Sequence, residues 1–382
     1  MVEWKKLGEV CQVLNGFAFK SSEYVPKGIR IIRISDVQNG YISDKDKVFY
    51  PIEKLSEFER YLLNNGDLVM SLTGNPGRVA FIRNESCALN QRVACLRAKT
   101  VSNSYLFYLF NCKEFESTAF ANSTGGAQKN LSTTWLNNYL IPIPSLEEQT
   151  RIVGILDTFT SAIDNLKEQI AQRRKQYEYY RDQLLDLEGK EGVEMKTLGE
   201  VCEISGDYGL SAPSKPYDGV RYLRITDITD SGGLNNEYVS ADLKEDAGKE
   251  PLVDGDILFA RTGATVGKTL VYRSNFGKCL FAGYLIRYRA RKQVVFPQYL
   301  FHFTHSTKYY NWVSASLAVG AQPNISAQRY NQLQFPLPPL SEQQRIVSIL
   351  DTFEASIQNL EAQLEQRQKQ YEYYRNKLLT FE

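Results

Sequence analysis

The sequence predicts an α+β protein with two similar globular domains and two long, antiparallel coiled-coil helices, related by an internal repeat with approximate two-fold symmetry. Two observations predict this fold. Six segments of the first half return in the same order in the second half, and each half ends in about 40 residues with an unbroken apolar heptad pattern. We expect globular domains over residues 1–144 and 189–340, and helices over 145–188 and 341–382.

The repeat is recognised from segments whose offset drifts only between about 189 and 194 residues. The paired segments are LGEVCQV (7–13) with LGEVCEI (198–204), RIIRISD (30–36) with RYLRITD (221–227), NGDLVMSLTG (65–74) with DGDILFARTG (254–263), GGAQKNLS (125–132) with VGAQPNIS (319–326), IPIPSLEEQTRIVGILDTF (141–159) with FPLPPLSEQQRIVSILDTF (335–353), and KQYEYYRDQLL (175–185) with KQYEYYRNKLL (369–379). The stretches between them have diverged, so a common framework carries different surfaces.

Each globular half mixes strands with short helices. RIIRISDV and RYLRITDI alternate in the manner of strands, and GDLVMSLTG and GDILFARTG have the pattern of apolar strands that end at a glycine turn. The runs SYLFYLFNC (104–112) and PQYLFHFTH (297–305) are more typical of buried helices.

The two long helices share one apolar seam with spacing 4, 3, 4, 3. We expect a capping box at both starts, Ser145 with Glu148 and Ser341 with Gln344. A helix of about 60 Å with a single apolar stripe needs a partner, and antiparallel pairing of the two fits a chain in which a whole domain separates them. Arg173 and Arg367 occupy equivalent seam positions and are expected to fix the register. The predicted core of the seam is Ile152, Leu156, Phe159, Ile163, Leu166, Ile170, Ile346, Leu350, Phe353, Ile357, Leu360 and Leu364.

Tyrosines are concentrated near the C-terminal end of each helix. Tyr177 and Tyr180 continue the seam, but Tyr179 and its repeat Tyr373 fall outside it. Exposed aromatic side chains are typical of protein interfaces, so we regard Tyr179 and Tyr373 as candidate partner-binding residues.

Several functional classes are disfavoured by composition. No apolar run approaches the roughly 20 residues that span a bilayer, and the N-terminus has no apolar signal segment, so we expect a cytoplasmic protein without membrane contact. The six cysteines show no C-x-x-C spacing and there are two histidines, so we expect no metal site. No methyltransferase motif or G-x-G-x-x-G loop is found, and we predict no catalytic residue in this chain.

Charge is unevenly distributed although the net charge is only +1. Residues 257–341 hold ten Lys and Arg and no Asp or Glu, whereas acids are concentrated over residues 227–256. Such segregation can create a basic face for a polyanion. The alternative is that these arginines lie scattered over different faces.

Two repeated loops carry the candidate nucleic-acid contacts. Glycine turns let a backbone approach phosphates closely, and amide side chains pair with adenine edges or hold a turn. Because both loops recur in both halves, a framework or backbone-contact role is favoured, and a plain turn remains the alternative. The residues are Thr73, Asn75, Arg78, Gln128, Lys129 and Asn130 in the first half, and Arg261, Thr262, Lys268, Gln322 and Asn324 in the second. Base-reading residues are expected in the divergent segments.

The doubled L-G-E start, the I-P-x-P-x-L-x-E-Q entry to each helix and the repeated Q-Y-x-Y-Y-R-x-x-L-L phrase together resemble the specificity subunit of type I restriction–modification systems. The resemblance covers essentially the whole chain. It implies two target recognition domains that each read one half of a split, asymmetric site in double-stranded DNA, with the helices setting the spacer. It also implies docking of two adenine methyltransferase subunits, which use S-adenosylmethionine, and of possible restriction subunits, which use ATP and Mg²⁺. No cofactor is then expected on this chain. A coiled-coil scaffold or regulator that binds nucleic acid without sequence preference is the alternative.

Overall fold

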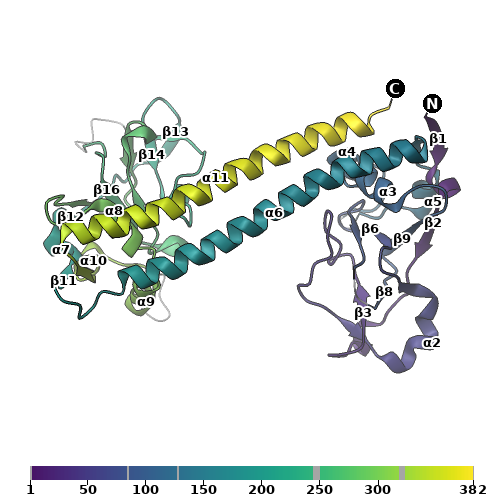
Figure 1. The fold of residues 1–382 in the computed structure, drawn as a ribbon, viewed down its shortest axis with the longest axis horizontal. Coiled ribbons are helices and arrows are strands. Elements are labelled where there is room, and N and C mark those ends of the chain that lie inside the picture. Colours follow the sequence, from purple (N-terminus) through teal and green to yellow (C-terminus); the bar gives the residue numbers. More distant parts are fainter. Residues whose placement is uncertain (1, 84–85, 127–128, 244–249, 318–322, 382) are drawn as a thin grey trace. The chain divides into compact units, whose positions relative to one another are not determined.

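The structure is a computed structural model that describes residues 2–83, 86–126, 129–243, 250–317 and 323–381 (Figure 1). The chain forms two compact units, which are described separately. The first comprises residues 1–165 together with 363–382, and the second comprises residues 166–362. The two long helices each contribute one part to either unit, so each unit contains a globular portion and a pair of helical segments.

The first unit contains a mixture of short strands and helices. Its strands are β1 (Glu3–Lys6), β2 (Cys11–Asn15), β3 (Ile29–Ile32), β4 (Phe49–Tyr50), β5 (Leu62–Leu63), β6 (Leu68–Ser71), β7 (Val79–Phe81), β8 (Cys87–Leu89), β9 (Val93–Ala98) and β10 (Leu140–Ile143). Its α-helices are α1 (Leu7–Val10), α2 (Leu55–Phe58), α3 (Asn103–Phe110), α4 (Lys113–Ala121), α5 (Thr133–Asn138) and the first part of α6 (Leu146–Leu185), and its 3₁₀ helices are η1 (Ser21–Glu23), η2 (Ile52–Lys54) and η3 (Glu59–Tyr61).

Two four-stranded sheets and a terminal strand pair organise this unit. One sheet is antiparallel with the order β2-β9-β6-β7, and the other has the order β4-β3-β8-β5 with β3 and β8 parallel. Strands β1 and β10 pair antiparallel just before α6 begins. Strands β6 and β9 pack against α3, α4 and α5 to form the core. Both strands are therefore buried along nearly their whole length.

The second unit repeats this plan, but two separate strand pairs replace the second four-stranded sheet. Its strands are β11 (Glu194–Thr197), β12 (Cys202–Tyr208), β13 (Ser214–Pro216), β14 (Arg221–Leu223), β15 (Val239–Ala241), β16 (Asp256–Ala260), β17 (Thr269–Val271), β18 (Cys279–Phe281), β19 (Leu285–Ala290) and β20 (Gln334–Leu337). Its α-helices are α7 (Leu198–Val201), α8 (Pro297–Phe303), α9 (Thr307–Ser316), α10 (Ala327–Asn331) and the first part of α11 (Leu340–Leu379), and its 3₁₀ helices are η4 (Ile225–Asp227), η5 (Gly263–Thr265) and η6 (Ser274–Phe276).

The repeat predicted from the sequence is evident in the topology. The antiparallel sheet β12-β19-β16-β17 corresponds to β2-β9-β6-β7, and the parallel pair β14–β18 corresponds to β3–β8. The strand pair β11–β20 precedes α11 as β1–β10 precedes α6. The predicted strands at the two glycine turns and the predicted buried helices α3 and α8 are therefore confirmed.

The long helices α6 and α11 pack together along the predicted seam, and within each unit their segments run antiparallel. In the first unit Ile152 and Leu156 of α6 pack with Tyr371 and Leu378 of α11. In the second unit Arg174 of α6 pairs with Glu361 of α11 at 2.5 Å, whereas Tyr177, further along α6, contacts Glu354. Seven of the twelve seam residues are buried and the other five are partly buried, and the buried ones are Ile152, Leu156, Ile163, Ile170, Ile346, Leu350 and Ile357.

The seam arginines contact aromatic rings. The guanidinium of Arg173 lies over the ring of Phe353 at 5.9 Å in the second unit, and Arg367 lies over Phe159 at 5.8 Å in the first. The two contacts repeat at equivalent places in the two units, and a guanidinium at this distance is attracted to the face of the ring.

Candidate nucleic-acid interface

The first glycine turn, residues 72–78, connects β6 to β7 and is fastened to a second loop. Thr73 Oγ1 donates a hydrogen bond to Asn130 Oδ1 at 3.1 Å, and the two residues also form an isolated backbone bridge. The amide of Gly74 donates to the carbonyl of Lys129 at 2.9 Å. Thr73, which is buried, is therefore joined to Lys129 and Asn130, which follow it by more than 50 positions in the chain.

Arg78, at the end of this turn, makes contacts within the protein. Its Nη1 donates to Gln38 Oε1 at 2.9 Å, and its Nε lies 3.5 Å from Glu116 Oε1 on α4. Asn39 also donates to Glu116, at 3.1 Å. Arg78 thus links the glycine turn to the loop that contains Gln38. A phosphate would have to compete with Glu116 for this guanidinium.

The second unit repeats the fastening of the glycine turn. Thr262 and Asn324 form an isolated backbone bridge, and the amide of Gly263 donates to the carbonyl of Pro323 at 3.0 Å. Arg261 Nε donates to Asn324 Oδ1 at 3.3 Å, and the Arg261 guanidinium lies 4.8 Å from the centre of the Tyr208 ring. The duplicated arrangement indicates that these asparagines hold the turn in both halves.

The remaining candidate residues separate into three groups. Lys268 forms an ion pair with Asp230 at 2.7 Å, so its ammonium faces a neighbouring loop as Arg78 does in the first unit. Asn75 lies in the first turn, where its backbone carbonyl accepts a hydrogen bond from Ser71 at 2.5 Å. Gln128 and Gln322 lie outside the described residues.

Part of the basic stretch of residues 257–341 is paired with acids inside the second unit. Arg289 holds Asp256 with two hydrogen bonds of 2.7 and 3.0 Å, and Arg287 pairs with Asp207 at 2.7 Å. Lys308 pairs with Glu188. The partners come from the acidic segment, as Asp256 does, and from elsewhere in the chain, as Asp207 and Glu188 do.

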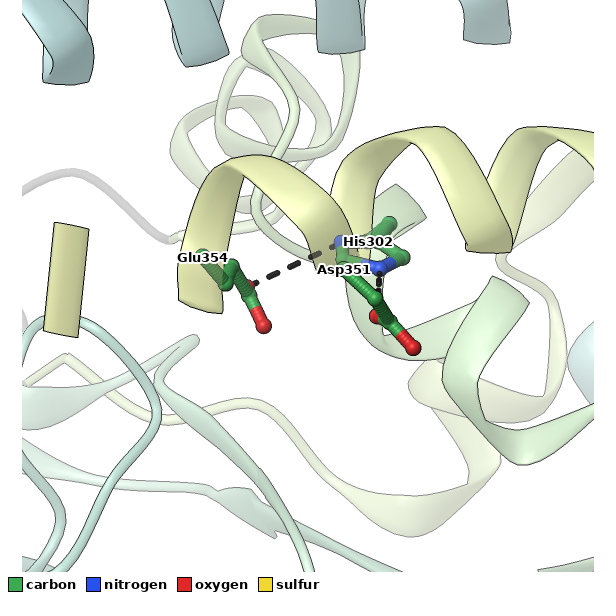
Figure 2. A group of neighbouring side chains, drawn as sticks. All are labelled: His302, Asp351 and Glu354. Atoms are coloured by element: carbon green, nitrogen blue, oxygen red, sulfur yellow. Dashed lines mark hydrogen bonds and ion pairs between the residues drawn. The ribbon is translucent and has the colours of Figure 1, made fainter. Parts of the chain in front are cut away.

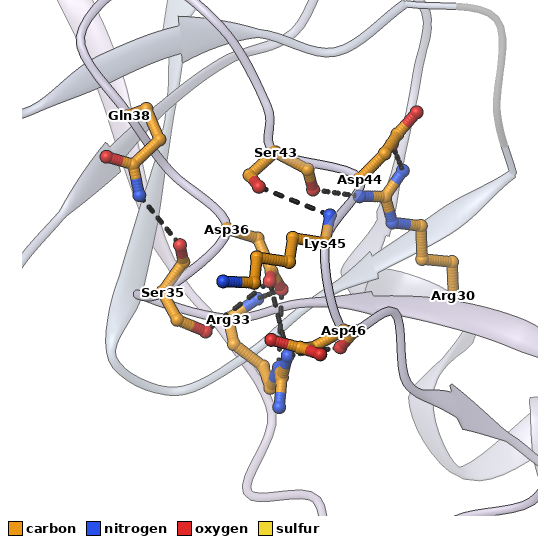
Figure 3. Close-up of polar contacts among 9 residues, drawn as sticks. All are labelled: Arg30, Arg33, Ser35, Asp36, Gln38, Ser43, Asp44, Lys45 and Asp46. Carbon is orange, nitrogen blue, oxygen red and sulfur yellow. Dashed lines mark hydrogen bonds and ion pairs between the residues drawn. The ribbon is translucent and has the colours of Figure 1, made fainter. Parts of the chain in front are cut away.

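A polar network that the sequence analysis did not anticipate surrounds the loop after β3 (Figure 3). Arg33 donates from its backbone amide and its Nε to Asp36 Oδ2, at 2.8 and 3.3 Å, and from Nη2 to the carbonyl of Asp46 at 2.6 Å. Arg30, which is 5% exposed, donates to the carbonyl of Ser43 at 2.7 Å and to Asp44 Oδ1 at 2.9 Å. The repeated R-x-x-R-I-[ST]-D motif was the available signal.

The equivalent loop of the second unit is held in the same way. Arg221, which is 3% exposed, donates from Nη2 to the carbonyls of Asn235 and Glu237 at 2.7 and 2.9 Å. Arg224 pairs with Asp227 at 2.7 Å and with Glu237 Oε2 at 3.1 Å. We call residues 36–46 and 227–237 the clamped loops.

The tyrosine-rich ends of the long helices present exposed aromatic side chains. Tyr179 is 62% exposed and Tyr373 is 61% exposed, although each touches the next tyrosine at ring-centroid distances of 5.4 and 5.3 Å. These two residues cover little of the seam. The two side chains are thus accessible at equivalent positions of α6 and α11.

A cluster with metal-ligand side chains lies where α8 meets α11 in the second unit (Figure 2). His302 Nε2 lies 2.8 Å from Asp351 Oδ1, and Nδ1 lies 3.8 Å from Glu354 Oε1 and 3.1 Å from the Tyr177 hydroxyl. Asp351 lies beside Nε2 of His302 and Glu354 lies beside Nδ1, whereas a metal ion would bind only one of these two nitrogens. We therefore interpret the cluster as hydrogen bonds that join α8 to α11. In the first unit the equivalent tie is Tyr108 donating to Asp157 at 2.5 Å.

Burial perturbs the titration of this region. It raises the pKa of Glu354 above its ordinary value, and it lowers the pKa of the nearby His305 to about 4, since an ionised form would be poorly solvated in both cases. Burial also raises the pKa of the Tyr177 hydroxyl, so this group is protonated and able to donate. The hydrogen bonds of this cluster join α6, α8 and α11 in the second unit.

Among the described helices, none combines the length and the apolar character needed to cross a membrane. Comparison with known families gives a match over both halves. The family model described as the type I restriction modification DNA specificity domain matches residues 1–173 and again residues 190–367. The two matches divide the chain in the same way as the internal repeat.

Curated proteins with similar sequences include the specificity subunit of the type I restriction enzyme EcoR124I/EcoR124II of Escherichia coli. It is 31% identical over 324 residues, which cover 78% of this chain and 75% of that protein. A putative type I restriction enzyme specificity subunit of Haemophilus influenzae is 28% identical over 403 residues, covering 100% of this chain and 96% of that protein.

Solved structures share the fold. The crystal structure of the S subunit of a type I restriction-modification system from M. genitalium superposes with a TM-score of 0.64 at 14% identity, covering 100% of this chain and 97% of that chain. A chain from a structural study of complex assembly and conformational transition of the type I R-M system gives a TM-score of 0.59 at 21% identity, with coverage of 99% and 96%.

Proposed function

Because the chain belongs to the type I restriction–modification DNA specificity family, and is thus a non-catalytic DNA-binding specificity subunit, we propose that it recognises an asymmetric, bipartite site in double-stranded DNA. It directs adenine methylation subunits, and restriction subunits where these are present, to that site. The expected place of action is the cytoplasm.

The observation that carries this proposal is the duplicated unit with retained framework and diverged loops. Sheets, glycine turns and loop clamps recur in both units, whereas the tips of the clamped loops read QNGY at 38–41 and TDSGG at 229–233. Two copies of one DNA-binding scaffold with different contact residues recognise two different half-sites. In this proposal residues 1–144 and 189–340 are the target recognition domains, and residues 145–188 and 341–382 are the helices that set the distance between the half-sites.

The glycine turns are proposed to contact the DNA backbone and to fix the register of each domain. Thr73, Asn75 and Lys129 in the first unit, and Arg261 and Thr262 in the second, lie on turns fastened by Asn130 and Asn324. Contacts of this kind position a protein on the duplex and carry no sequence information, which is consistent with their recurrence in both halves. Gln128, Gln322, Arg78 and Lys268 remain candidates for the same surface.

The partners follow from the family. Two copies of an adenine methyltransferase subunit dock on the helices and supply S-adenosylmethionine chemistry, and restriction subunits supply the steps that use ATP and Mg²⁺. This chain contributes recognition and binds no cofactor of its own. The two tyrosine-rich helix ends offer one docking point for each methyltransferase copy, because the phrase occurs twice.

The decisive experiment is a methylome comparison of cells that express the methylation subunit with and without this chain. We expect methylated adenines in one motif with two unequal halves and a fixed unread spacer, present only with this chain. A palindromic or continuous motif would refute the proposal. Methylation without any motif would instead favour a scaffold that binds nucleic acid without sequence preference.

A further inference from the structure

The two clamped loops, residues 36–46 and 227–237, share a construction that separates their backbone from their sequence. In the first unit, Arg30 of β3 donates to the carbonyl of Ser43, and Arg33, which follows β3, donates to the carbonyl of Asp46. Both bonds hold the part of the loop that returns towards the body of the unit. In the second unit, Arg221 holds the carbonyls of Asn235 and Glu237. Because the arginines bind backbone carbonyls and carboxylates that lie outside the tips QNGY and TDSGG, the side chains of the tips can differ without loss of the clamp.

Both loops are also closed across their tips. Val37 and Ile42 form an antiparallel bridge in the first loop, and Ile228 and Leu234 form one in the second. Gly232 has φ +74, and a Cβ at this position would lie 2.4 Å from the Phe301 ring of α8, so the second loop is seated directly against the body of the unit. A loop fixed in this way loses little conformational freedom on binding, which favours affinity and discrimination.

The tip of each clamped loop lies beside the proposed backbone-contact turn. Arg78, which ends the first turn, donates to Gln38 at 2.9 Å, and Lys268, which ends the second, pairs with Asp230 at 2.7 Å. A glycine turn that contacts phosphates fixes the register of its domain on the DNA. The adjoining clamped loop then faces the base edges in the groove, where sequence is read.

The side chains on these loops have the chemistry of base readers. Asn39 and Tyr41 are exposed on the first loop, with Tyr41 61% exposed, and Ser231 and Asn236 are exposed on the second. An amide can pair with the edge of adenine, a hydroxyl accepts or donates to several bases, and an aromatic ring can contact the methyl group of thymine. The two sets differ, as two unequal half-sites require.

We propose that the clamped loops are the base-reading segments, with Asn39 and Tyr41 reading the first half-site and Ser231 and Asn236 reading the second. Arg30, Arg33, Arg221 and Arg224 are positioning residues that hold the loops in the reading conformation. This inference rests on the proposed function, since it names the residues that select the two halves of the DNA target.

The test is a methylome experiment with Asn39→Ala/Tyr41→Ala and, separately, Ser231→Ala/Asn236→Ala. Each double variant is expected to relax one or two positions in its own half of the motif and to leave the other half and the spacer unchanged. The control is Ile52→Ala, which removes an exposed side chain elsewhere in the first unit (58% exposed) and should preserve the whole motif.

Binding measurements keep the inference falsifiable if a variant no longer supports methylation. The purified complex is titrated with oligonucleotides in which each base pair of one half-site is replaced. Loss of a base contact should reduce discrimination at the affected position by about tenfold to a hundredfold. Retained discrimination at every position, or an unchanged methylome motif, overturns the inference. If the unaltered chain yields no bipartite motif, the proposed function itself fails.

The positioning role has its own readout. Arg33→Lys retains a charge opposite Asp36 but lacks the second donor that reaches the Asp46 carbonyl. We expect weaker discrimination in the first half-site and unchanged discrimination in the second, measured at a temperature where the variant is folded. Equal loss in both half-sites, or none, would contradict the positioning role.

Discussion

Phe159 of α6 and Tyr374 of α11 stack with ring centroids 5.3 Å apart and an interplanar angle of 26°. The repeat of this contact joins Tyr180 and Phe353 at 5.4 Å and 25° in the second unit. Each phenylalanine also accepts the guanidinium of the seam arginine from the facing helix, Arg367 or Arg173. The duplicated tyrosine phrase therefore completes an aromatic contact between the helices in both units.

Substitution of Phe159 and Tyr374 should reveal a favourable interaction energy between α6 and α11. We predict that Phe159→Ala and Tyr374→Ala each lower the free energy of unfolding, and that the double variant loses less than the sum by about 0.5–1.5 kcal/mol, the usual worth of an aromatic pair beyond its buried area. A double-mutant cycle in urea measures this. Losses that add to within about 0.3 kcal/mol would show that the stacking contributes nothing specific.

A second prediction concerns acid sensitivity in the second unit. The folded protein holds the pKa of His305 at about 4, below its ordinary 6.5, so the unfolded chain binds more protons between these pH values. Neutral His305 therefore favours folding above pH 6.5, and this contribution, about 3 kcal/mol, is lost as the pH falls towards 4. Glu354 has the opposite effect, because its raised pKa makes protonation in the folded protein increase the free energy of unfolding as the pH falls.

The measurement is the unfolding midpoint between pH 7.5 and 5. His305→Gln should reduce the fall in the midpoint on acidification, because glutamine does not titrate, while Glu354→Gln should steepen it. Identical pH profiles for the unaltered chain and His305→Gln would rule out this histidine as a source of the effect.

The third prediction concerns the aspartates after the two glycines of the G-D pairs. Asp256 is fully buried, accepts two hydrogen bonds from Arg289 and one from the Val253 amide, and closes the turn before β16. Removing one partner of a buried ion pair costs about 3–5 kcal/mol, so Asp256→Ala should destabilise the second unit by that amount. The repeat pair Asp67–Arg97 has a more exposed arginine, and Asp67→Ala should cost less. Urea unfolding of both variants gives the order, and a larger loss at Asp67 would contradict it.

Sequence patterns predicted the elements that depend on local periodicity. The heptads located α6 and α11 and predicted that they pair, and the domain between them predicted the antiparallel sense found within each unit. The apolar runs located β6, β16, α3 and α8. One half of the predicted capping box forms, since the Ser145 hydroxyl accepts from the Glu148 amide at 3.2 Å, whereas the Glu148 carboxylate accepts from Arg151. Ser341, in contrast, lies inside α11, which begins at Leu340 because the Pro339 carbonyl accepts the amides of Glu342 and Gln343.

Features that depend on contacts between distant segments were not predictable from periodicity. RIIRISDV was expected to be one strand, but β3 ends at Ile32 because Arg33 and Asp36 close a turn. The charge segregation after residue 257 also did not show which cations are paired inside the fold, as Arg287 and Arg289 are with Asp207 and Asp256. Long-range pairing of this kind leaves no trace in local spacing, and only the repetition of the motifs in both halves indicated that these residues had a structural role.

The fourth prediction tests the proposed docking role of the tyrosine phrase. Tyr179→Ala together with Tyr373→Ala removes two side chains that are 62% and 61% exposed, so the fold should be preserved while co-purification with the methylation subunit weakens. Lys175→Ala with Lys369→Ala, exposed positions on the same helices, serves as the control and should co-purify normally. Unchanged recovery of the methylation subunit with the tyrosine variant would count against this docking role.

The last prediction tests whether the helices set the spacer. A heptad inserted after Asn165 in α6 and another after Ala362 in α11 keeps the seam in phase and lengthens both helices by about 10 Å, at 1.5 Å per residue. At 3.4 Å per base pair this equals about three base pairs, so the methylated motif should keep both halves and gain a spacer about three base pairs longer. Three base pairs also rotate the second half-site by about a quarter turn around the duplex, because a turn holds about ten. Methylation should therefore be weaker as well as displaced. A motif with its original spacer would show that something other than the length of α6 and α11 fixes the distance between the half-sites.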